Sequence, residues 1–292
     1  MIFCGANTLE NGRTIANLAQ NKQTTGTSMN LNLENKTALV TGSTAGIGFA
    51  IARSLAAEGT RVVVNGRTQE RVSESIASIR ESHPNARLEP FVANLTNAEA
   101  AIEAARRFPS IDILVNNLGV YEPKPFEQIS DDDWRAIIEA NFMSGVRLSR
   151  HYLSRMKAAN WGRIIFISSE SAMNIPVEMI HYGVTKTMQV ALARGLAETT
   201  AGTAITVNSV LAGPTRSEGV EKFLIDMAKT KNVTPEEIEK EFFHTARPTS
   251  LLQRFATTDE VAALVTFVAS PLSSATNGAA LRVDGGVVRS IF

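Results

Sequence analysis

The chain has almost no cysteine and no excess of charge of either sign. Cys4 is the one cysteine among 292 residues, so no disulfide can form within the chain and we expect a protein of the reducing cytoplasm. The 29 basic and 29 acidic residues cancel, which leaves no long-range field to attract a nucleic acid or an anionic membrane. The composition therefore argues against both classes of partner.

Three other patterns are also missing. No apolar run approaches the roughly 20 residues that cross a bilayer, and residues 1 to 20 have neither the basic start nor the apolar stretch of an export signal. The four histidines form no HExxH or Cys/His pattern, so we expect no metal site. In "GSTAG", Thr44 stands where the nucleophile elbow of an α/β-hydrolase needs serine, which argues against that class.

What the chain does have is a regular alternation of short apolar runs with amphipathic stretches. The alternation predicts a doubly wound α/β sheet of parallel strands that is buried on both faces. The predicted strands are residues 37–40, 61–65, 88–94, 111–117, 163–168, 204–210 and 280–286. We predict a flexible extension at residues 1–28, one domain at 29–292, and a helical excursion without strands at about 215–255, long enough to serve as a lid.

Residues 41–48, "TGSTAGIG", place three glycines between a predicted strand and a predicted helix. Glycine permits a tight turn and lets backbone N–H groups approach a pyrophosphate, and a helix N-terminus adds a favourable dipole. A tight turn without a ligand is the alternative. The strand, loop and helix context favours a dinucleotide site.

Further motifs follow in a fixed order: "NNLG" at 116–119, "SS" at 168–169, "YGVTK" at 182–186 and "VDGG" at 283–286. Together with Gly42, Gly46 and Gly48, they resemble the short-chain dehydrogenase/reductase family over roughly residues 33–288, and most of all its 3-oxoacyl-carrier-protein reductase branch. The resemblance implies a single Rossmann-type domain with a mainly parallel, seven-stranded sheet. It also implies an oxidoreductase that uses a nicotinamide cofactor.

The second predicted strand indicates which cofactor is used. Gly66 stands where an acidic residue would hold the ribose 2′-OH of NAD, and Arg67 beside it can accommodate a 2′-phosphate. The sequence therefore favours NADP(H), with NAD(H) still possible, although Arg67 is alternatively a solvated residue at a helix start. The resemblance places the following residues at the cofactor: Gly42, Ser43, Thr44, Gly46, Ile47, Gly48, Asn65, Arg67, Asn94, Leu95, Asn117, Gly119, Tyr182, Lys186, Gly213 and Thr215.

Tyr182 and Lys186 are four residues apart and share a helix face, and Ser169 lies thirteen residues upstream of Tyr182 at the end of a predicted strand. A carbonyl that accepts hydride needs a hydrogen-bond donor and a proton. Ser169 can polarise the oxygen and Tyr182 can deliver the proton, while Lys186 would favour the phenolate, because free tyrosine titrates near ~10. The resemblance adds Asn141 as part of a proton relay.

Structural roles compete with each of these assignments. Ser169 could be a strand-end hydroxyl satisfied by backbone, as could its neighbour Ser168, and Tyr182 could be a buried ring with Lys186 extending to solvent. In the excursion, five apolar side chains could face a substrate, but packing is the commoner role in a helix. They are Phe223, Leu224, Met227, Phe242 and Phe243.

We predict an NADP(H)-dependent reductase of a ketone or 3-oxoacyl thioester. An alcohol dehydrogenase that oxidises a secondary alcohol or sugar is the alternative, and a protein that senses NADPH without turnover is a weaker one. The predicted partners are a small-molecule substrate and, by resemblance, further copies of the chain in a homotetramer or homodimer. The contacts between the copies would involve helices at about 131–157 and 182–200.

Overall fold

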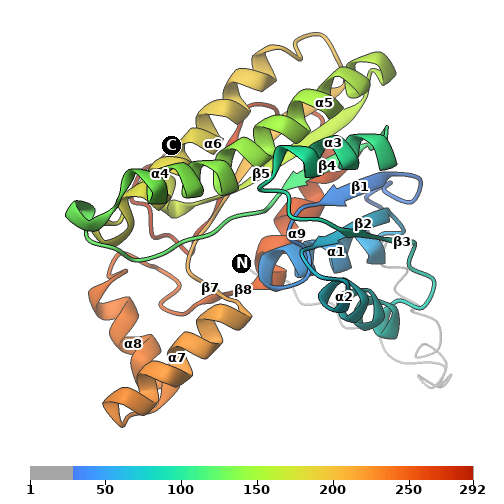
Figure 1. The fold of residues 1–292 in the computed structure, drawn as a ribbon. Coiled ribbons are helices and arrows are strands. Elements are labelled where there is room, and N and C mark those ends of the chain that lie inside the picture. The colour runs from blue at the N-terminus through green and yellow to red at the C-terminus, as the bar shows by residue number, and fades with distance from the viewer. Residues whose placement is uncertain (1–28, 292) are drawn as a thin grey trace, which may run out of the picture. The chain divides into compact units, whose positions relative to one another are not determined.

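The computed structural model describes residues 29–291, and the fold below is that of the unit Leu31–Phe292. The extension predicted at residues 1–28 and the cysteine within it lie outside the described residues. A central sheet carries helices on both faces, and a helical pair projects from one end of it (Figure 1).

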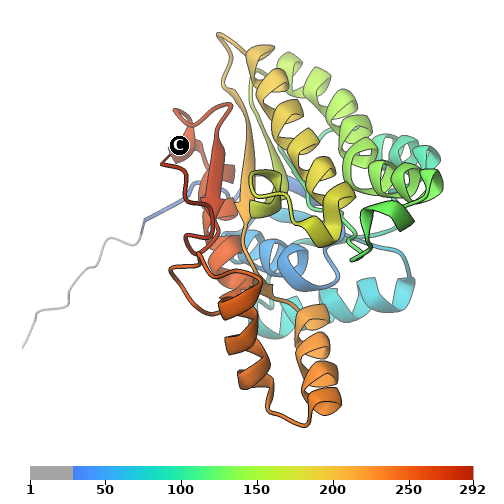
Figure 2. The ribbon, with the colours of Figure 1, turned by 90° about the vertical axis from the view of Figure 1, so that its left-hand side faces the viewer.

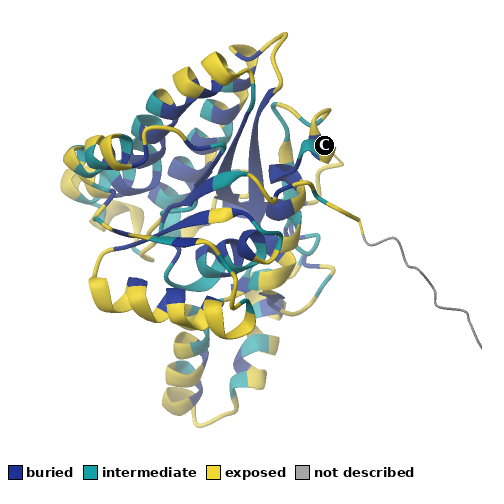
Figure 3. Ribbon diagram, turned by 90° about the vertical axis from the view of Figure 1, so that its right-hand side faces the viewer, coloured by how far each residue is buried: buried dark blue, intermediate teal, exposed yellow. Residues whose placement is uncertain are grey.

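The sheet has seven strands in the order β3-β2-β1-β4-β5-β6-β9, and every neighbouring pair is parallel. This confirms the predicted doubly wound arrangement. The strands are β1 (Thr37–Val40), β2 (Arg61–Gly66), β3 (Leu88–Val92), β4 (Ile113–Asn116), β5 (Gly162–Ser169), β6 (Ile205–Ala212) and β9 (Ala280–Val283). The central strands are buried throughout (Figure 3). Pro90 is tolerated because β3 is an edge strand.

Two helical layers cover the sheet, each over its own apolar core. One layer contains α1 (Gly46–Ala57), α2 (Gln69–Ser82) and α9 (Thr258–Ala269), and the other contains α3 (Ala98–Arg107), α4 (Asp131–Ile138), α5 (Ser144–Ala159) and α6 (Ile180–Glu198). Short 3₁₀ turns occur at Phe126–Gln128, Glu170–Ala172, Val177–Met179 and Pro271–Ser273. Both faces of the sheet are therefore apolar, as the unbroken hydrophobic runs predict.

The helix predicted at about 131–157 is interrupted. A π-helical turn, Glu139–Met143, joins α4 to α5 without a break in direction. Such turns shift the backbone hydrogen-bond register by one residue and occur often at functional sites. Asn141, one of the predicted catalytic residues, lies within this turn.

The excursion, hereafter the lid (residues 215–255), differs from its prediction in one respect. It contains α7 (Glu218–Lys231) and α8 (Pro235–Thr245), as expected, but it begins with a strand, β7 (Thr215–Arg216), that pairs with β8 (Ala256–Thr257). The prediction of helices without strands was therefore wrong at this end. Two residues are too few for a strand pattern to be visible in sequence.

The lid has an apolar core of its own, and Figure 2 shows its two helices side by side. Phe242, Phe243 and Phe255 pack ring against ring with centroids 5.1 Å apart, and Leu224 is fully buried beside them. Met227 packs against the same core. Packing therefore accounts for these side chains, whereas Phe223 is 51% exposed.

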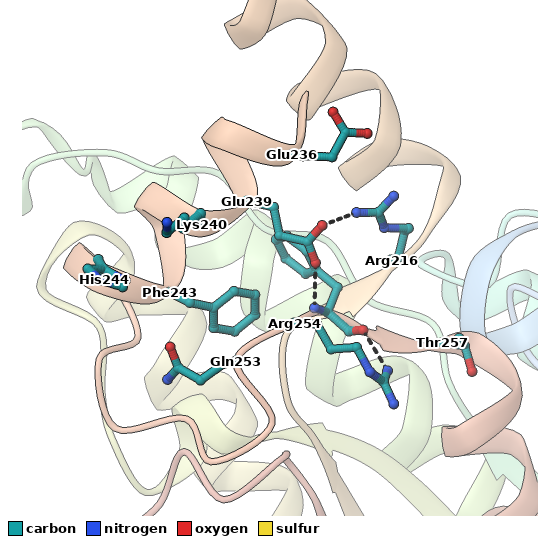
Figure 4. Close-up of a pocket in the computed structure, with 10 residues that line it drawn as sticks. Arg216, Glu236, Glu239, Lys240, Phe243, His244, Gln253, Arg254 and Thr257 are labelled. Atoms are coloured by element: carbon teal, nitrogen blue, oxygen red, sulfur yellow. Dashed lines mark hydrogen bonds and ion pairs between the residues drawn. The ribbon is translucent and has the colours of Figure 1, made fainter. Parts of the chain in front are cut away.

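The lid contains a hollow of about 740 Å³, which lies beside α8 (Figure 4). Glu239 crosses it, because its carboxylate accepts a hydrogen bond from Phe255 N at 2.9 Å and pairs with Arg216. This one side chain ties α8 to both β7 and the start of β8. The hollow is lined by lid residues and their flanks and lies apart from Ser169, Tyr182 and Lys186.

Replacing Phe243 by alanine should loosen the lid but not the sheet. Truncating a buried phenylalanine typically costs about 3–5 kcal/mol, so amides of α7 and α8 should exchange with solvent much faster while those of β4 and β5 stay protected. Hydrogen exchange measured by mass spectrometry checks this. Phe223→Ala, at an exposed position of α7, is the control, and equal exchange in both variants would contradict the packing role.

Candidate active site

The predicted site residues gather along one edge of the sheet, where the carboxyl ends of the parallel strands meet. The loops after β1, β2, β3, β4 and β6 and the end of β5 all contribute, and α6 and the π-helical turn bring the rest. In open α/β sheets this edge is where ligands bind. β1 and β4 are neighbours in the sheet although β2 and β3 lie between them in sequence, and at such a reversal of strand order open α/β sheets form their ligand-binding crevice.

The glycine loop after β1 has the backbone that its sequence predicts. Gly42 and Gly46 have φ values of +61° and +54°, which residues with a side chain rarely adopt. Gly48 is needed for a different reason: a Cβ there would lie 2.3 Å from the Gly42 carbonyl oxygen and 2.4 Å from Asn117 Nδ2. The loop can therefore present its backbone at close range, and α1 begins directly at Gly46.

Asn65, at the end of β2, holds this loop in place. Its Oδ1 accepts from Gly42 N at 3.0 Å, and its Nδ2 donates to the carbonyls of Phe91 and Ala93 at 3.1 Å each. Ser43 is fully buried and its Oγ accepts from Asn65 N at 2.8 Å. Both side chains, which we predicted at the cofactor, thus bond to the loop and its neighbouring strands.

Asn117 supports the loop from the other side. Its Nδ2 donates to the carbonyls of Thr41 and Gly42 at 2.9 and 3.1 Å, and its N–H donates to Thr41 Oγ1 at 2.9 Å. Gly119 lies two residues further on, and a Cβ on it would come within 3.2 Å of Lys186 Nζ. Asn117 and Gly119 therefore connect the glycine loop to Lys186.

The residues predicted near the adenosine are open to solvent. Arg67 is exposed and, within residues 29–291, forms no hydrogen bond or ion pair. Asn94 is also exposed, and its Oδ1 accepts from Thr96 N and Oγ1. Leu95 is buried in the core, so its backbone alone faces the edge. Gly66 leaves no room for a carboxylate, since a Cβ there would lie 2.5 Å from Thr44 Cγ2.

Ser169, Tyr182 and Lys186 come together from β5 and α6. Ser169 ends β5 near enough to the Tyr182 hydroxyl to lower its pKa, and its Oγ accepts from Ser171 N at 3.1 Å. Lys186 Nζ lies 5.5 Å from the centre of the Tyr182 ring. Lys186 is buried and donates to the Ile167 carbonyl at 2.9 Å, so it does not extend to solvent. Ser168, by contrast, donates to the Lys186 carbonyl.

Burial sets the proton affinities of both groups. It raises the pKa of Tyr182 to about 12, against the lowering effect of the Ser169 hydrogen bond. It also lowers the pKa of Lys186 to about 8. Each shift disfavours the charged form, as desolvation does. In the protein alone, the low tyrosine pKa that we expected from Lys186 is therefore not reached.

Asn141 is buried and joins the loop after β4 to α6. Its side chain exchanges two hydrogen bonds with the backbone of Val120, at 2.7 and 2.9 Å, and donates to Thr185 Oγ1 at 3.0 Å. Its carbonyl accepts from Gln189 Nε2 at 2.5 Å. Thr185 and Gln189 flank Lys186 on α6, so Asn141 lies close to the lysine that the sequence pattern pairs with it.

The last predicted segment, after β6, covers the other end of the crevice. A Cβ on Gly213 would lie 2.6 Å from the backbone of Asp284, so glycine is required for the approach of "VDGG". Thr215 is buried and donates to the Gly213 carbonyl at 2.9 Å. Ser217 caps α7, and a Cβ built on Gly46 would come within 3.3 Å of its Cβ. The lid therefore starts against the glycine loop.

Three neighbours of Tyr182 escaped the sequence analysis. The Tyr121 ring meets the Tyr182 ring edge to face with centroids 6.0 Å apart. Glu170 and Arg247 also act on the charge of Tyr182. Glu170 could have been noticed as an acidic residue directly after a buried strand. Arg247 carries no such signal, because 77 residues separate it from Glu170.

Comparisons with known proteins agree with this site. A family model described as short chain dehydrogenase matches residues 36–227. The uncharacterized oxidoreductase YvaG of Bacillus subtilis is 51% identical over 264 residues, which cover 90% of this chain and 100% of that protein. The 3-oxoacyl-acyl-carrier-protein reductase FabG of Aquifex aeolicus is 31% identical over 263 residues, with 89% and 100% covered.

Among solved structures, L-sorbose reductase from Gluconobacter frateurii, complexed with NADPH and L-sorbose, superposes with a TM-score of 0.84 at 26% identity. The match covers 90% of this chain and 100% of that one. The fold and the similarities define an oxidoreductase that acts on CH–OH or carbonyl groups. The chain belongs to the short chain dehydrogenase family.

Two negative observations apply to residues 29–291. None of their helices has both the length and the apolarity to cross a membrane. No three of their His, Cys, Asp and Glu side chains are grouped to hold a metal ion.

Replacing Asn65 by leucine should destabilise the glycine loop. The change leaves Gly42 N and two carbonyls without their partner in a buried region, and an unsatisfied buried group costs about 1–3 kcal/mol. Urea unfolding should therefore show a lower free energy of unfolding, by a few kcal/mol. Asn85→Leu, in an exposed turn, is the control. Equal stability of the two variants would show that Asn65 does not support the loop.

Proposed function

We propose that this protein is an NADP(H)-dependent reductase that converts a carbonyl compound, a ketone or a 3-oxoacyl thioester, into a secondary alcohol. One observation carries the proposal: Ser169, Tyr182 and Lys186 lie together beside a glycine loop whose backbone is open for a nucleotide. The reductases among its relatives support the same direction of reaction.

The cofactor fits the residues of this chain. The absence of Cβ atoms at Gly42, Gly46 and Gly48 leaves the loop backbone open to a pyrophosphate at the start of α1. Arg67 has no competing partner in the described chain and is free to pair with a 2′-phosphate, while Gly66 excludes an acidic side chain that would repel it. When bound, NADPH supplies the hydride, and its oxidised form carries a positive charge on the nicotinamide.

Ser169 and Tyr182 handle the carbonyl oxygen. Both hydroxyls lie at the carboxyl edge of the sheet, and Ser169 is near enough to Tyr182 to lower its pKa, so one oxygen atom can accept from both. Ser169 orients that oxygen and Tyr182 transfers its proton to it as negative charge develops. Because burial holds the Tyr182 pKa near 12 in the protein alone, the proton is in place before the reaction.

Lys186 and Asn141 complete the proton path. Once Tyr182 has given up its proton, the nearby Lys186 ammonium stabilises the phenolate. A lysine pKa of about 8 also allows Lys186 to pass a proton on near neutral pH. Asn141 holds the segment at Val120 and Gly119 beside Lys186, which makes it a positioning residue for the relay.

Tyr182→Phe should abolish turnover while NADPH binding is kept. Loss of a general acid typically costs about 10²–10⁴-fold in rate. In the native protein, carbonyl reduction needs the protonated tyrosine, so its rate should fall as pH rises through the Tyr182 pKa. Alcohol oxidation needs the phenolate and should rise over the same range. Steady-state rates in both directions check this, and unchanged turnover in the variant would refute the role of Tyr182.

Arg67→Ala should weaken NADPH binding and leave NADH binding nearly unchanged. A charge-assisted hydrogen bond to phosphate is worth about 1.5–3 kcal/mol, which corresponds to about ten- to a hundred-fold in affinity. Titration followed by the fluorescence of the reduced nicotinamide measures both constants. An equal loss for the two nucleotides would mean that Arg67 does not meet the 2′-phosphate.

We also propose assembly into a homotetramer or homodimer through α5 and α6. Their outer surface carries a hollow of about 320 Å³ with a largely apolar lining that includes Val146, Leu153, Leu192 and Leu196. Light scattering should show a dimer or tetramer at micromolar concentration. Val146→Arg should dissociate it, whereas Ile102→Arg on exposed α3 should not. A monomeric native protein would overturn the assembly.

A further inference from the structure

Arg247 connects the lid to the segment that lies between Ser169 and Tyr182. Its Nε donates to Glu170 Oε1 at 2.7 Å, and one of its terminal nitrogens lies 3.6 Å from Glu178. Glu170 directly follows Ser169 at the end of β5, and Glu178 lies four residues before Tyr182. One guanidinium from the lid therefore contacts the segment that joins Ser169 to Tyr182 at two points, Glu170 and Glu178.

The contact with Glu170 is shielded from water. Glu170 is 3% exposed, and the side chain of Arg247 is 13% exposed. Breaking such a buried pair by removing one partner leaves an uncompensated charge, which makes a shielded pair far more consequential than a surface one. Elsewhere on the lid, the Lys231–Glu241 pair is about half exposed, at 41% and 50%.

Arg247 is also firmly joined to α8. Its N–H donates to the Phe242 carbonyl at 3.1 Å, and its guanidinium lies 5.9 Å from the Phe242 ring, which belongs to the lid core. At the base of the lid, Glu239 fixes α8 to β7 and β8. The lid is thus a packed unit, fastened at its base by Glu239 and near Tyr182 by Arg247.

We propose that the Arg247–Glu170 pair is a latch: it fastens the lid beside Ser169 and couples the position of the lid to the charge next to Tyr182. Both are positioning residues, and neither needs to touch the substrate. The inference rests on the proposed function only in that Tyr182 is the proton donor of the reaction.

Glu170 and Arg247 shift the pKa of Tyr182 in opposite directions. The Glu170 carboxylate raises the pKa of Tyr182 and Arg247 lowers it. An open lid would remove Arg247 and leave Glu170 acting alone, so Tyr182 would hold its proton more tightly. The polar and charged groups around Tyr182 and Glu170 come from every adjoining segment: Ser169, Glu170, Tyr121, Lys186, Glu178, Arg247 and, beyond Glu170, Asp284.

Two readouts on the full chain, neither of which needs a substrate, test the latch. Hydrogen exchange reports how firmly α8 is held, and the absorbance of tyrosinate after a rapid pH jump, native protein minus Tyr182→Phe, reports the titration of Tyr182. Arg247→Gln should speed α8 exchange by about ten-fold or more, the scale of one charge-assisted hydrogen bond. It should also move the titration to higher pH.

Glu170→Gln should loosen α8 in the same way but move the titration to lower pH. The double variant should titrate between the two single variants. Arg247→Lys keeps the charge, so its titration should stay near that of the native protein, and it tests the electrostatic coupling even if Arg247→Gln fails to fold. Lys231→Gln, on the same lid, is the matched control and should change neither readout.

Shifts of the same sign in Arg247→Gln and Glu170→Gln, or unchanged α8 exchange in both, would overturn the latch. Different results would refute the proposed function, namely no binding of NADPH or full turnover in Tyr182→Phe. Neither of those outcomes affects the two latch readouts, so the failures can be told apart.

Discussion

The hydrogen bonds that fix the glycine loop are the constraint on which the rest of the site depends. Asn65 accepts from Gly42 N through its Oδ1 and is itself held by the Phe91 and Ala93 carbonyls, while Asn117 Nδ2 donates to the carbonyls of Thr41 and Gly42. The loop thereby gains a defined shape. Because Gly119, two residues after Asn117, lies beside Lys186, the same bonds also set the distance between the glycine loop and Lys186.

Burial determines the charge states of Tyr182 and Lys186, the two titratable groups of the proposed catalytic site. Desolvation drives the pKa of Tyr182 up and that of Lys186 down, so both groups tend towards neutrality in the protein alone. A positive charge placed nearby would stabilise the phenolate, and more strongly than at an exposed position because Lys186 and Ser169 beside it are buried. The site is therefore sensitive to each charge that enters it, whether from a cofactor or from Arg247 on the lid.

The features of the fold that could be predicted from the sequence are those that local residue patterns determine. The parallel strands followed from hydrophobic runs and the glycine loop from its turn residues, whereas the grouping of Ser169, Tyr182 and Lys186 was predicted from the resemblance to a known family. Sequence reasoning could not find the Arg247–Glu170 pair, because that contact joins distant segments and depends on how the lid docks. Nor could it show that the Asn65 side chain hydrogen-bonds with the backbone, since a polar residue at the end of a strand could equally well bind a ligand.

The most direct test of this account is calorimetric titration of NADPH into the native protein and into Gly48→Ala. A Cβ at residue 48 would press into the Gly42 carbonyl and Asn117, so it should distort the loop together with the Asn117 side chain that supports it. We expect binding to the native protein and its loss in a folded Gly48→Ala. Absence of binding to the native protein, or equal binding to both, would contradict the claim that this loop holds the nucleotide.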